Sequence, residues 1–226
     1  MHRMLSVTAL LSSLALPLSA QGTDTAGTKH HHDDADHAVE GGGTAPAGWT
    51  VRADDKGNPK NVKVVTMGNG LHLTLGPAII LYRAEDDGAG PFHTLATFTQ
   101  TKKTDHAEGY GLFFGGQDLA GAGQKYTYFL VRQDGSYLVK SRDGEKTTEI
   151  TKGWVKHSSV HQPDAQGAAT NLLEVDAKRD PAKVSFKVNG QTVQTVDASS
   201  LNLKGIVGIR ANHHLDLHVE GFGVHR

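Results

Sequence analysis

Aromatic and basic side chains that could hold a sugar gather in the second half of the chain. The faces of aromatic rings stack on the C–H faces of sugars, while arginine donates hydrogen bonds to sugar hydroxyls. Core packing would account equally well for at least one of the two tyrosines. The residues of this set are Tyr126, Tyr128, Arg132, Trp154 and Arg210. They form the first part of a predicted saccharide-binding site.

A second polar set occupies alternate positions of the segment 214–220, HLDLHVE. Side chains two residues apart share one face of a strand, so His214, Asp216 and His218 are expected on one face, with Glu220. Same-face neighbours are about 6.5–7 Å apart, and two imidazoles at that spacing can reach one divalent ion such as Zn²⁺. Contact with sugar hydroxyls and a plain solvated face are the alternatives. We therefore predict His214 and His218 as sugar contacts and His214, Asp216 and His218 as a possible metal site, with no other cofactor.

The elements that must position these residues read as strands. Tyr126–Arg132 is apolar on both faces, which is typical of a strand in the middle of a sheet that is covered on both sides. Asp134-Gly135 predicts a tight hairpin turn after it, and Asn189-Gly190 is the strongest hairpin signal in the chain. Alternating apolar residues predict further strands, and no stretch has a helical period over ten residues. Short strands with frequent turns indicate an all-β fold of two antiparallel sheets. Besides Tyr126–Arg132, the expected strands are Trp49–Arg52, Val62–Thr66, Leu71–Leu75, Ala78–Tyr82, Phe92–Thr101, Tyr110–Phe114, Ser136–Arg142, Lys146–Ile150, Thr170–Lys178, Lys183–Val188, Gln191–Val196, Ile206–Ala211 and Leu215–Val219.

The first 48 residues differ in composition from the rest. Residues 1–20 combine Arg3, an apolar stretch and a small-residue end, which predicts a signal peptide and a secreted or periplasmic protein. Residues 21–48 have almost no large apolar side chains, so we expect a disordered tail before a domain of residues 49–226. This tail could capture Zn²⁺, Ni²⁺ or Cu²⁺ weakly, or it could be a solvated segment without an ordered site. Its candidate ligands are His30, His31, His32, Asp33, Asp34, Asp36 and His37.

The totals exclude several functions. The formal charge of −1 over 226 residues gives no broad basic field for nucleic acid, and no membrane insertion is expected. The absence of cysteine excludes disulfides and thiolate catalysis. The glycine-rich stretch 117–124 lacks the GK[ST] ending of a phosphate loop, and no G-x-S-x-G elbow occurs. We expect a monomer whose partner is a saccharide or glycan.

From about Trp49 to Arg226, the sequence resembles the concanavalin A-like lectin/glucanase superfamily. It looks most like laminin-G-type and 3-keto-disaccharide hydrolase domains (DUF1080-like) of secreted bacterial proteins. The resemblance implies a jelly-roll sandwich that often binds sugar on one sheet, although this fold hosts lectins, hydrolases and interaction modules alike. The segments that carry it are 111–115 (GLFFG), 126–131 (YTYFLV), 134–137 (DGSY), 173–175 (LEV), 184–190 (VSFKVNG), 205–210 (GIVGIR) and 219–222 (VEGF).

Retaining glucanases of this superfamily carry a strand motif in which two carboxylates about 5 Å apart act as nucleophile and acid. The nearest segment here begins at Glu174 and contains Asp176, but Lys178 or Arg179 stands where the third acid should be. A cation cannot donate that proton, so we predict no catalytic residue. The leading hypothesis is a non-catalytic sugar-binding module. A glycoside-acting enzyme and an envelope interaction module are the alternatives.

Overall fold

The structure, a computed structural model, describes residues 36–54 and 57–226. In that part of the chain fifteen strands and two short 3-10 helices, η1 (Pro59–Asn61) and η2 (Ala198–Ser200), follow one another. No helix within these ranges has the length and apolar character needed to span a bilayer. The predicted signal peptide and residues 21–35 of the predicted tail lie outside the described residues.

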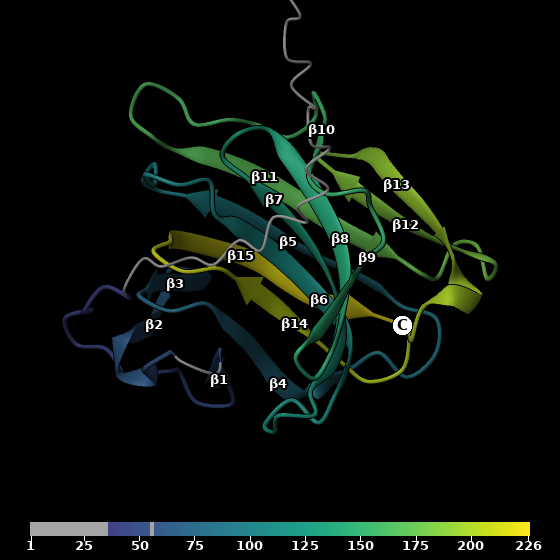
Figure 1. Cartoon of the computed structure of the whole chain (residues 1–226), viewed down its shortest axis with the longest axis horizontal. Helices are drawn as coiled ribbons and strands as arrows, with labels where there is room; N and C mark the ends of the chain where they lie inside the picture. Colours follow the sequence, from purple (N-terminus) through teal and green to yellow (C-terminus); the bar gives the residue numbers. More distant parts are fainter. Residues whose placement is uncertain (1–35, 55–56) are drawn as a thin grey trace, which may run out of the picture. The chain divides into compact units, whose positions relative to one another are not determined.

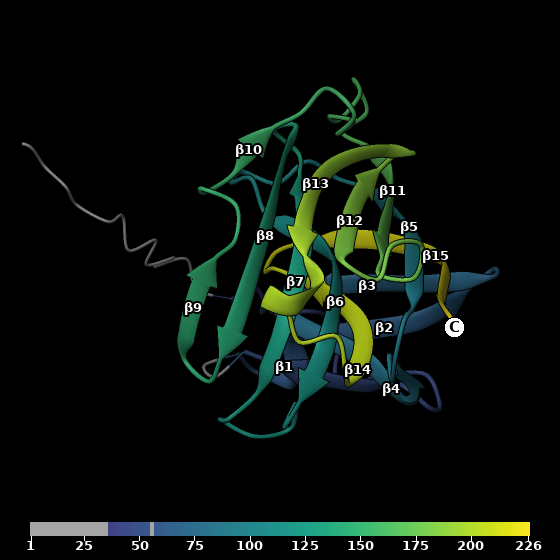
Figure 2. The same ribbon diagram turned by 90° about the vertical axis from the view of Figure 1, so that its right-hand side faces the viewer.

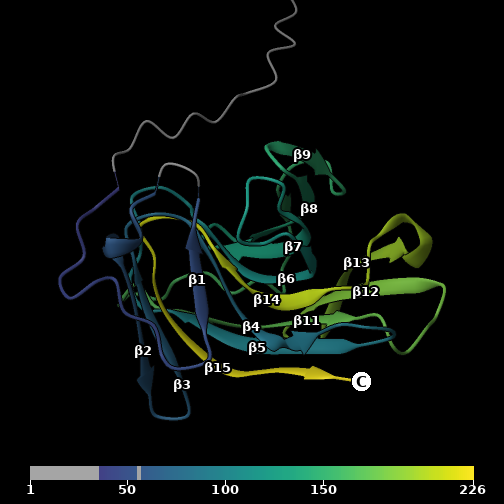
Figure 3. The ribbon, with the colours of Figure 1, turned by 90° about the horizontal axis from the view of Figure 1, so that it is seen from below.

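The strands form two antiparallel sheets that stack face to face (Figure 3). Figure 2 shows β8 and β9 on one side of the molecule and β5, β11 and β15 on the other. The eight-stranded sheet has the spatial order β1 (Thr50–Ala53), β4 (Ile79–Asp87), β14 (Ile206–Ala211), β6 (Gly109–Gln117), β7 (Lys125–Arg132), β8 (Ser136–Asp143) and β10 (Val155–Lys156), and β9 (Lys146–Glu149) also pairs with β8. The seven-stranded sheet has the order β13 (Gln191–Asp197), β12 (Lys183–Val188), β11 (Ala169–Asp176), β5 (His93–Gln100), β15 (Asp216–His225), β3 (Gly70–Leu75) and β2 (Val62–Met67). The predicted all-β sandwich is confirmed.

The main core lies between the two sheets, where the alternating apolar residues of each strand meet. Leu173, Val175 and Phe186 are fully buried on the seven-stranded side, and Leu112 and Phe129 on the eight-stranded side. Burying such side chains stabilises the fold by about 1.5–3 kcal/mol each. The prediction that Leu215, Leu217 and Val219 face the core is also confirmed, because all three belong to this cluster.

Two hairpin turns show how glycine sets the connection. Val188 pairs with Gln191, and both Asn189 and Gly190 have positive φ angles, so a two-residue turn forms there as predicted. The turn at Asp134-Gly135 is longer than predicted. Arg132 pairs with Ser136, and of the three residues between them only Gly135 has a positive φ, of 81°. A three-residue loop that ends on a left-handed glycine is the next commonest hairpin connection.

Three strands differ from the sequence-based expectation. β4 continues to Asp87, where a loop was expected, because Ile206 of β14 pairs with Asp87 past an irregularity in the register. In this stretch Arg83 donates to both carboxylate oxygens of the buried Asp86 at 2.7 and 3.0 Å. The last strand, β15, runs to His225, past an irregularity between Glu220 and Gly223. The expected loop 152–167 contains the two-residue strand β10.

The segment before Trp49 lies against the sandwich. The amide of Gly43 donates to Val62 O at 2.7 Å, and Thr44 forms a parallel bridge with Lys63. The Trp49 ring centroid lies 5.6 Å from that of Phe222. Figure 1 shows β1, which follows Trp49, beside β4. The predicted boundary at Trp49 stays a prediction.

Candidate functional site

The outer face of the eight-stranded sheet carries a second apolar cluster. Strand alternation places Phe129 and Val131 in the main core, so Tyr128 and Leu130 of the same strand point outward. A sheet with one solvated face would carry polar residues at these positions. The buried members of the cluster are Ile80, Phe113, Leu119, Tyr126, Tyr128, Leu130 and Leu138.

Aromatic rings form the centre of this face. Phe113 lies opposite Tyr128 in the β6–β7 register, and its ring centroid is 5.2 Å from that of Tyr126. The rings of Tyr126 and Tyr128 are 5.8 Å apart, and Tyr82 meets the edge of Phe113 at 6.4 Å. Tilted and edge contacts of this kind add about 0.5–1.5 kcal/mol to the burial of each pair.

Glycines on neighbouring strands make room for these rings. A Cβ on Gly208 would lie 2.5 Å from the Phe113 ring, and one on Gly109 would lie 2.8 Å from the Trp154 ring. Both separations are below van der Waals contact, so a side chain at either position would displace the aromatic ring. The glycines of β14 and β6 are therefore part of the architecture of this face.

A buried ion pair lies beside the aromatic rings. Arg210 of β14 donates two hydrogen bonds to the carboxylate of Asp54, both of 2.8 Å. Burial disfavours the charge on Asp54, but the Arg210 guanidinium outweighs this effect and lowers the pKa of Asp54, with smaller contributions from Arg142 and Arg52.

Tyr128 is kept neutral by its surroundings. Burial raises the pKa of Tyr128 to about 12, against the opposing influence of Arg210. Its side chain is 9% exposed and that of Tyr126 is 3% exposed. The Tyr128 hydroxyl therefore acts as a hydrogen-bonding group on this face, and not as a base at neutral pH.

Several polar atoms of this face are buried without a hydrogen-bond partner among the described residues. They are the hydroxyl of Tyr126, Nε of Arg142 and both amide atoms of the Gln124 side chain. Tyr126 and Arg142 lie opposite each other on β7 and β8, and Gln124 precedes Tyr126 by two positions. A buried polar group without a partner costs about 1–3 kcal/mol, so such groups usually mark a bound water or ligand.

Arg132 and Trp154 lie at the other end of the same face. The Arg132 guanidinium is 4.3 Å from the centroid of the Trp154 ring, a cation–π contact. Arg132 also contacts Asp134 at 2.8 Å and donates to the Ser136 hydroxyl at 2.9 Å. Of the predicted sugar contacts, Tyr126, Tyr128, Arg132, Trp154 and Arg210 thus lie on one face.

The two predicted histidines lie elsewhere. His218 is on the outer face of the seven-stranded sheet, with its ring centroid 6.3 Å from that of His72 on β3. His214 precedes β15, in the connection from β14, and has a φ of +57°. The regular alternation of the strand therefore does not extend to His214. The carboxylate oxygen Oδ1 of Asp216 lies 3.3 Å from Nε2 of His72. The predicted set of His214, Asp216 and His218 stays a prediction.

Comparisons with known proteins identify the fold. The chain has a TM-score of 0.57 with carbohydrate binding module CBM66 from Bacillus subtilis, at 12% identity over 79% of this chain and 96% of that one. It has a TM-score of 0.53 with a mixed-linkage glucan GH16 protein of Bacteroides ovatus, at 10% identity over 80% and 96%. With a Bacillus licheniformis β-glucanase the TM-score is 0.52, at 9% identity over 80% of this chain and 92% of that one.

The fold is the concanavalin A-like sandwich. This architecture is shared by carbohydrate-binding modules and glycanases. No protein-family model and no curated protein matches the sequence, so membership of the 3-keto-disaccharide hydrolase family stays a prediction.

Sequence reasoning missed several residues of the outer face. Arg52, Asp54 and Arg142 were not singled out, although Arg142 alternates with Lys140 and Leu138 along β8. Asp54 and Arg210 are separated by 156 positions in the chain, and no local pattern connects them. Gln124 carries a usable signal, because its spacing of two from Tyr126 and four from Tyr128 continues the alternation of β7.

Proposed function

We propose that this protein binds a saccharide on the outer face of its eight-stranded sheet. The observation that carries the proposal is the group of buried, unpartnered polar atoms on Gln124, Tyr126 and Arg142, beside aromatic rings. A sugar hydroxyl both donates and accepts hydrogen bonds, so one ring could satisfy the amide, the phenol and the guanidinium together. The C–H face of the sugar would stack on the partly exposed aromatic rings of the same cluster, Tyr82 and Trp154.

The structural relatives support a saccharide over other small polar ligands. CBM66 is named as a carbohydrate binding module, and two further proteins of the same fold are named as acting on glucans. Identities of 9–12% restrict this support to the architecture. The specific residues come from this chain alone.

The charge of the face favours an acidic saccharide. Arg210 and Arg142 both lower the pKa of Asp54, so guanidinium groups lie near the unpartnered polar atoms. Charged hydrogen bonds between a guanidinium and a carboxylate are about twice as strong as neutral ones. We therefore expect a uronic-acid oligosaccharide to bind more tightly than a neutral oligosaccharide of the same length, with an advantage that shrinks as salt is added.

Binding fits this face better than cleavage does. A retaining glycosidase needs two carboxyl groups about 5 Å apart, one of them free to donate a proton. Asp54 is held by two hydrogen bonds from Arg210, and Glu149 is an exposed residue of β9 paired with Lys140 at 3.6 Å. Neither carboxylate is placed as a proton donor, and Glu174 contacts His93 on the opposite sheet at 3.0 Å.

The test is titration calorimetry with oligosaccharide panels, neutral and uronic, on wild type and Tyr126→Phe. This substitution removes one hydroxyl that has no partner among the described residues, so stability should be unchanged or slightly higher. One lost hydrogen bond of about 1 kcal/mol weakens binding by about 5-fold. His218→Ala, on the outer face of the other sheet, is the matched control and should bind as wild type does.

Two outcomes would overturn the proposal. A folded wild-type protein that binds no member of either panel would remove the function altogether. Wild-type affinity in both Tyr126→Phe and Gln124→Met, together with weaker binding in the His218→Ala control, would move the site to the other sheet.

A further inference from the structure

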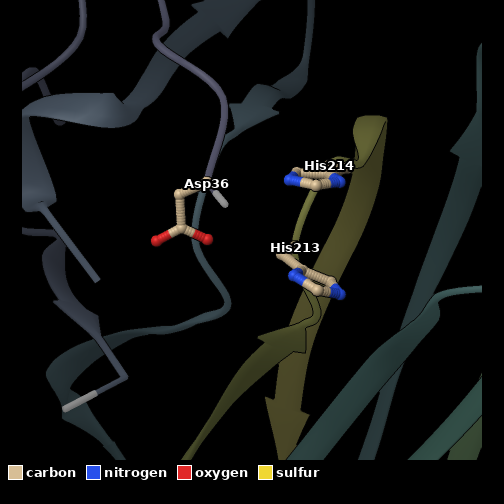
Figure 4. Close-up of side chains that lie close together, drawn as sticks. All are labelled: Asp36, His213 and His214. Carbon is tan, nitrogen blue, oxygen red and sulfur yellow. The ribbon is translucent and has the colours of Figure 1, made fainter. Parts of the chain in front are cut away.

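Three side chains of the kind that bind transition metals converge where β14 passes into β15. Asp36, His213 and His214 each offer one ligand atom, and these atoms all lie within 4.8 Å of one another. Figure 4 shows the Asp36 carboxylate facing the two imidazoles, which lie one above the other. Asp36 comes from the segment before β1, so the group joins two distant parts of the sequence.

The backbone holds the two histidines firmly in the β14–β15 connection. The amide of Asn212 donates to Gly109 O at 2.8 Å, and that of His214 donates to Gly76 O at 3.1 Å. His214 has a φ of +57°, a left-handed conformation that few non-glycine residues adopt. Strained conformations of this type cluster at functional sites, where the surrounding structure enforces them.

A buried carboxylate orients one of the imidazoles. Glu108 Oε1 lies 2.9 Å from Nε2 of His213, and Glu108 is 2% and His213 9% exposed. A metal-binding histidine usually donates its second ring N–H to a carboxylate or carbonyl, which fixes the tautomer and raises the basicity of the ligating nitrogen. In the Glu108–His213 pair, Nε2 of His213 faces such a carboxylate.

The imidazole rings of this group are packed closely. His213 and His214 stack with centroids 4.6 Å apart and planes at 20°, and His37 meets the edge of His214 at 3.8 Å. His213 and His214 are therefore close enough for one cation to bind both. His37 lies one residue from Asp36 and is exposed, so it is a further donor beside the group.

We propose that Asp36, His213 and His214 form a Zn²⁺ site. Two imidazole nitrogens and one carboxylate oxygen are ligands that zinc takes in proteins, and a chain without cysteine must use these types. Zinc prefers four ligands, so one position is left for water or for His37. The bound ion would fasten residues 36–48 to the β14–β15 connection and so stabilise the folded protein in proportion to the logarithm of free zinc.

The experiment uses the full chain in two forms, unmodified and with His30, His31 and His32 changed to alanine. The second form removes the competing histidine run, so that any remaining high-affinity zinc reports on the proposed site. Equilibrium dialysis with ZnCl₂ should give one ion per chain in the second form. Zinc should also raise its melting temperature, and a chelator should reverse the rise.

Ligand variants are then made in the form without the histidine run. Asp36→Asn and His214→Ala should each weaken zinc binding by about 100-fold or more, and Glu108→Gln by about 10–100-fold, as expected for a residue that positions a ligand. His161→Ala, an exposed histidine that contacts Thr170 O, is the matched control and should bind zinc as the parent does. Asp36→Asn leaves the two sheets untouched, so it remains informative if a histidine variant folds poorly.

Two results would contradict the zinc site. One is the absence of zinc binding in the form without the histidine run, which would assign all bound zinc to that run. The other is parental affinity in both Asp36→Asn and His214→Ala. Neither result would bear on sugar binding, which is measured with different variants.

Discussion

The two outer faces of this sandwich have opposite characters although their inner faces are alike. On the eight-stranded sheet, Phe113, Tyr126 and Leu130 are buried on the outer face. On the seven-stranded sheet, the outward side chains of β5 and β15 are partly exposed and include Thr99 and His218. The difference shows that one sheet has two packed faces and the other has one.

The seven-stranded face is held together by polar pairs across its strands. Thr99 and Thr170 share a hydrogen bond of 2.9 Å, and His93 contacts Glu174 at 3.0 Å. Exposed pairs of this kind contribute about 0.2–1 kcal/mol each. The eight-stranded face is instead held by aromatic packing and a buried ion pair, which have larger energies and leave less freedom for substitution.

Truncation of Phe113 is the strongest test of this difference. Phe113→Ala should lower the free energy of unfolding by about 3–5 kcal/mol, because the ring packs against Tyr126 and covers Gly208. Thr99→Ala, at an outward position of the other sheet, should cost less than about 1 kcal/mol. Urea unfolding followed by tryptophan fluorescence measures both, and equal losses would show that the two faces do not differ.

Loss of the Arg210 guanidinium should have the next largest effect. Arg210→Met keeps the length of the side chain and leaves Asp54 without its bidentate partner, so we expect a loss of about 2–3 kcal/mol. The loss stays below the range for a fully buried charge because the side chain of Asp54 is 29% exposed. Lys102→Ala breaks an exposed contact to Asp216 on the other face and should cost about 0–1 kcal/mol.

Acid should weaken the eight-stranded face through Asp54. The folded-state pKa of Asp54 is lowered, so its contribution is fully present above the unfolded value of about 4 and is lost as the pH falls below it. Asp54→Asn removes this contribution. The free energy of unfolding of the variant should therefore fall less steeply than that of wild type as the pH drops below about 4. Unfolding midpoints measured at successive pH values test this, and parallel curves would count against a charged Asp54.

Much of the fold could be predicted from local sequence, and its long-range pairings could not. The strand at Thr170–Lys178 and the turn at Asn189-Gly190 could be predicted because each is determined by the types of neighbouring residues. β7 could be placed in the middle of a sheet because both of its faces are apolar. The continuation of β4 to Asp87 depends on pairing with Ile206 of β14, which is distant in the sequence, so the local glycine-rich composition predicted a loop instead.

The candidate sites show the same division. Tyr126 and Tyr128 could be found because they are aromatic and two positions apart on a strand. Asp36, Glu108 and His213 come from three separate segments, and only the folded chain brings them together. The predicted strand segment from His214 to Glu220 begins two positions before β15, because His214 lies in the β14–β15 turn and has a φ of +57°.

The position of β15 has a consequence for how this protein reaches its folded state. The β2–β3 hairpin is hydrogen-bonded to the rest of its sheet through β15, which lies between β3 and β5 and follows every other strand in the chain. Until β15 inserts, β3 and β5 present unpaired edges that can join to other chains. Nascent or partly unfolded molecules are therefore expected to aggregate through these two edges, and assembly should be slow because its last step closes a long loop.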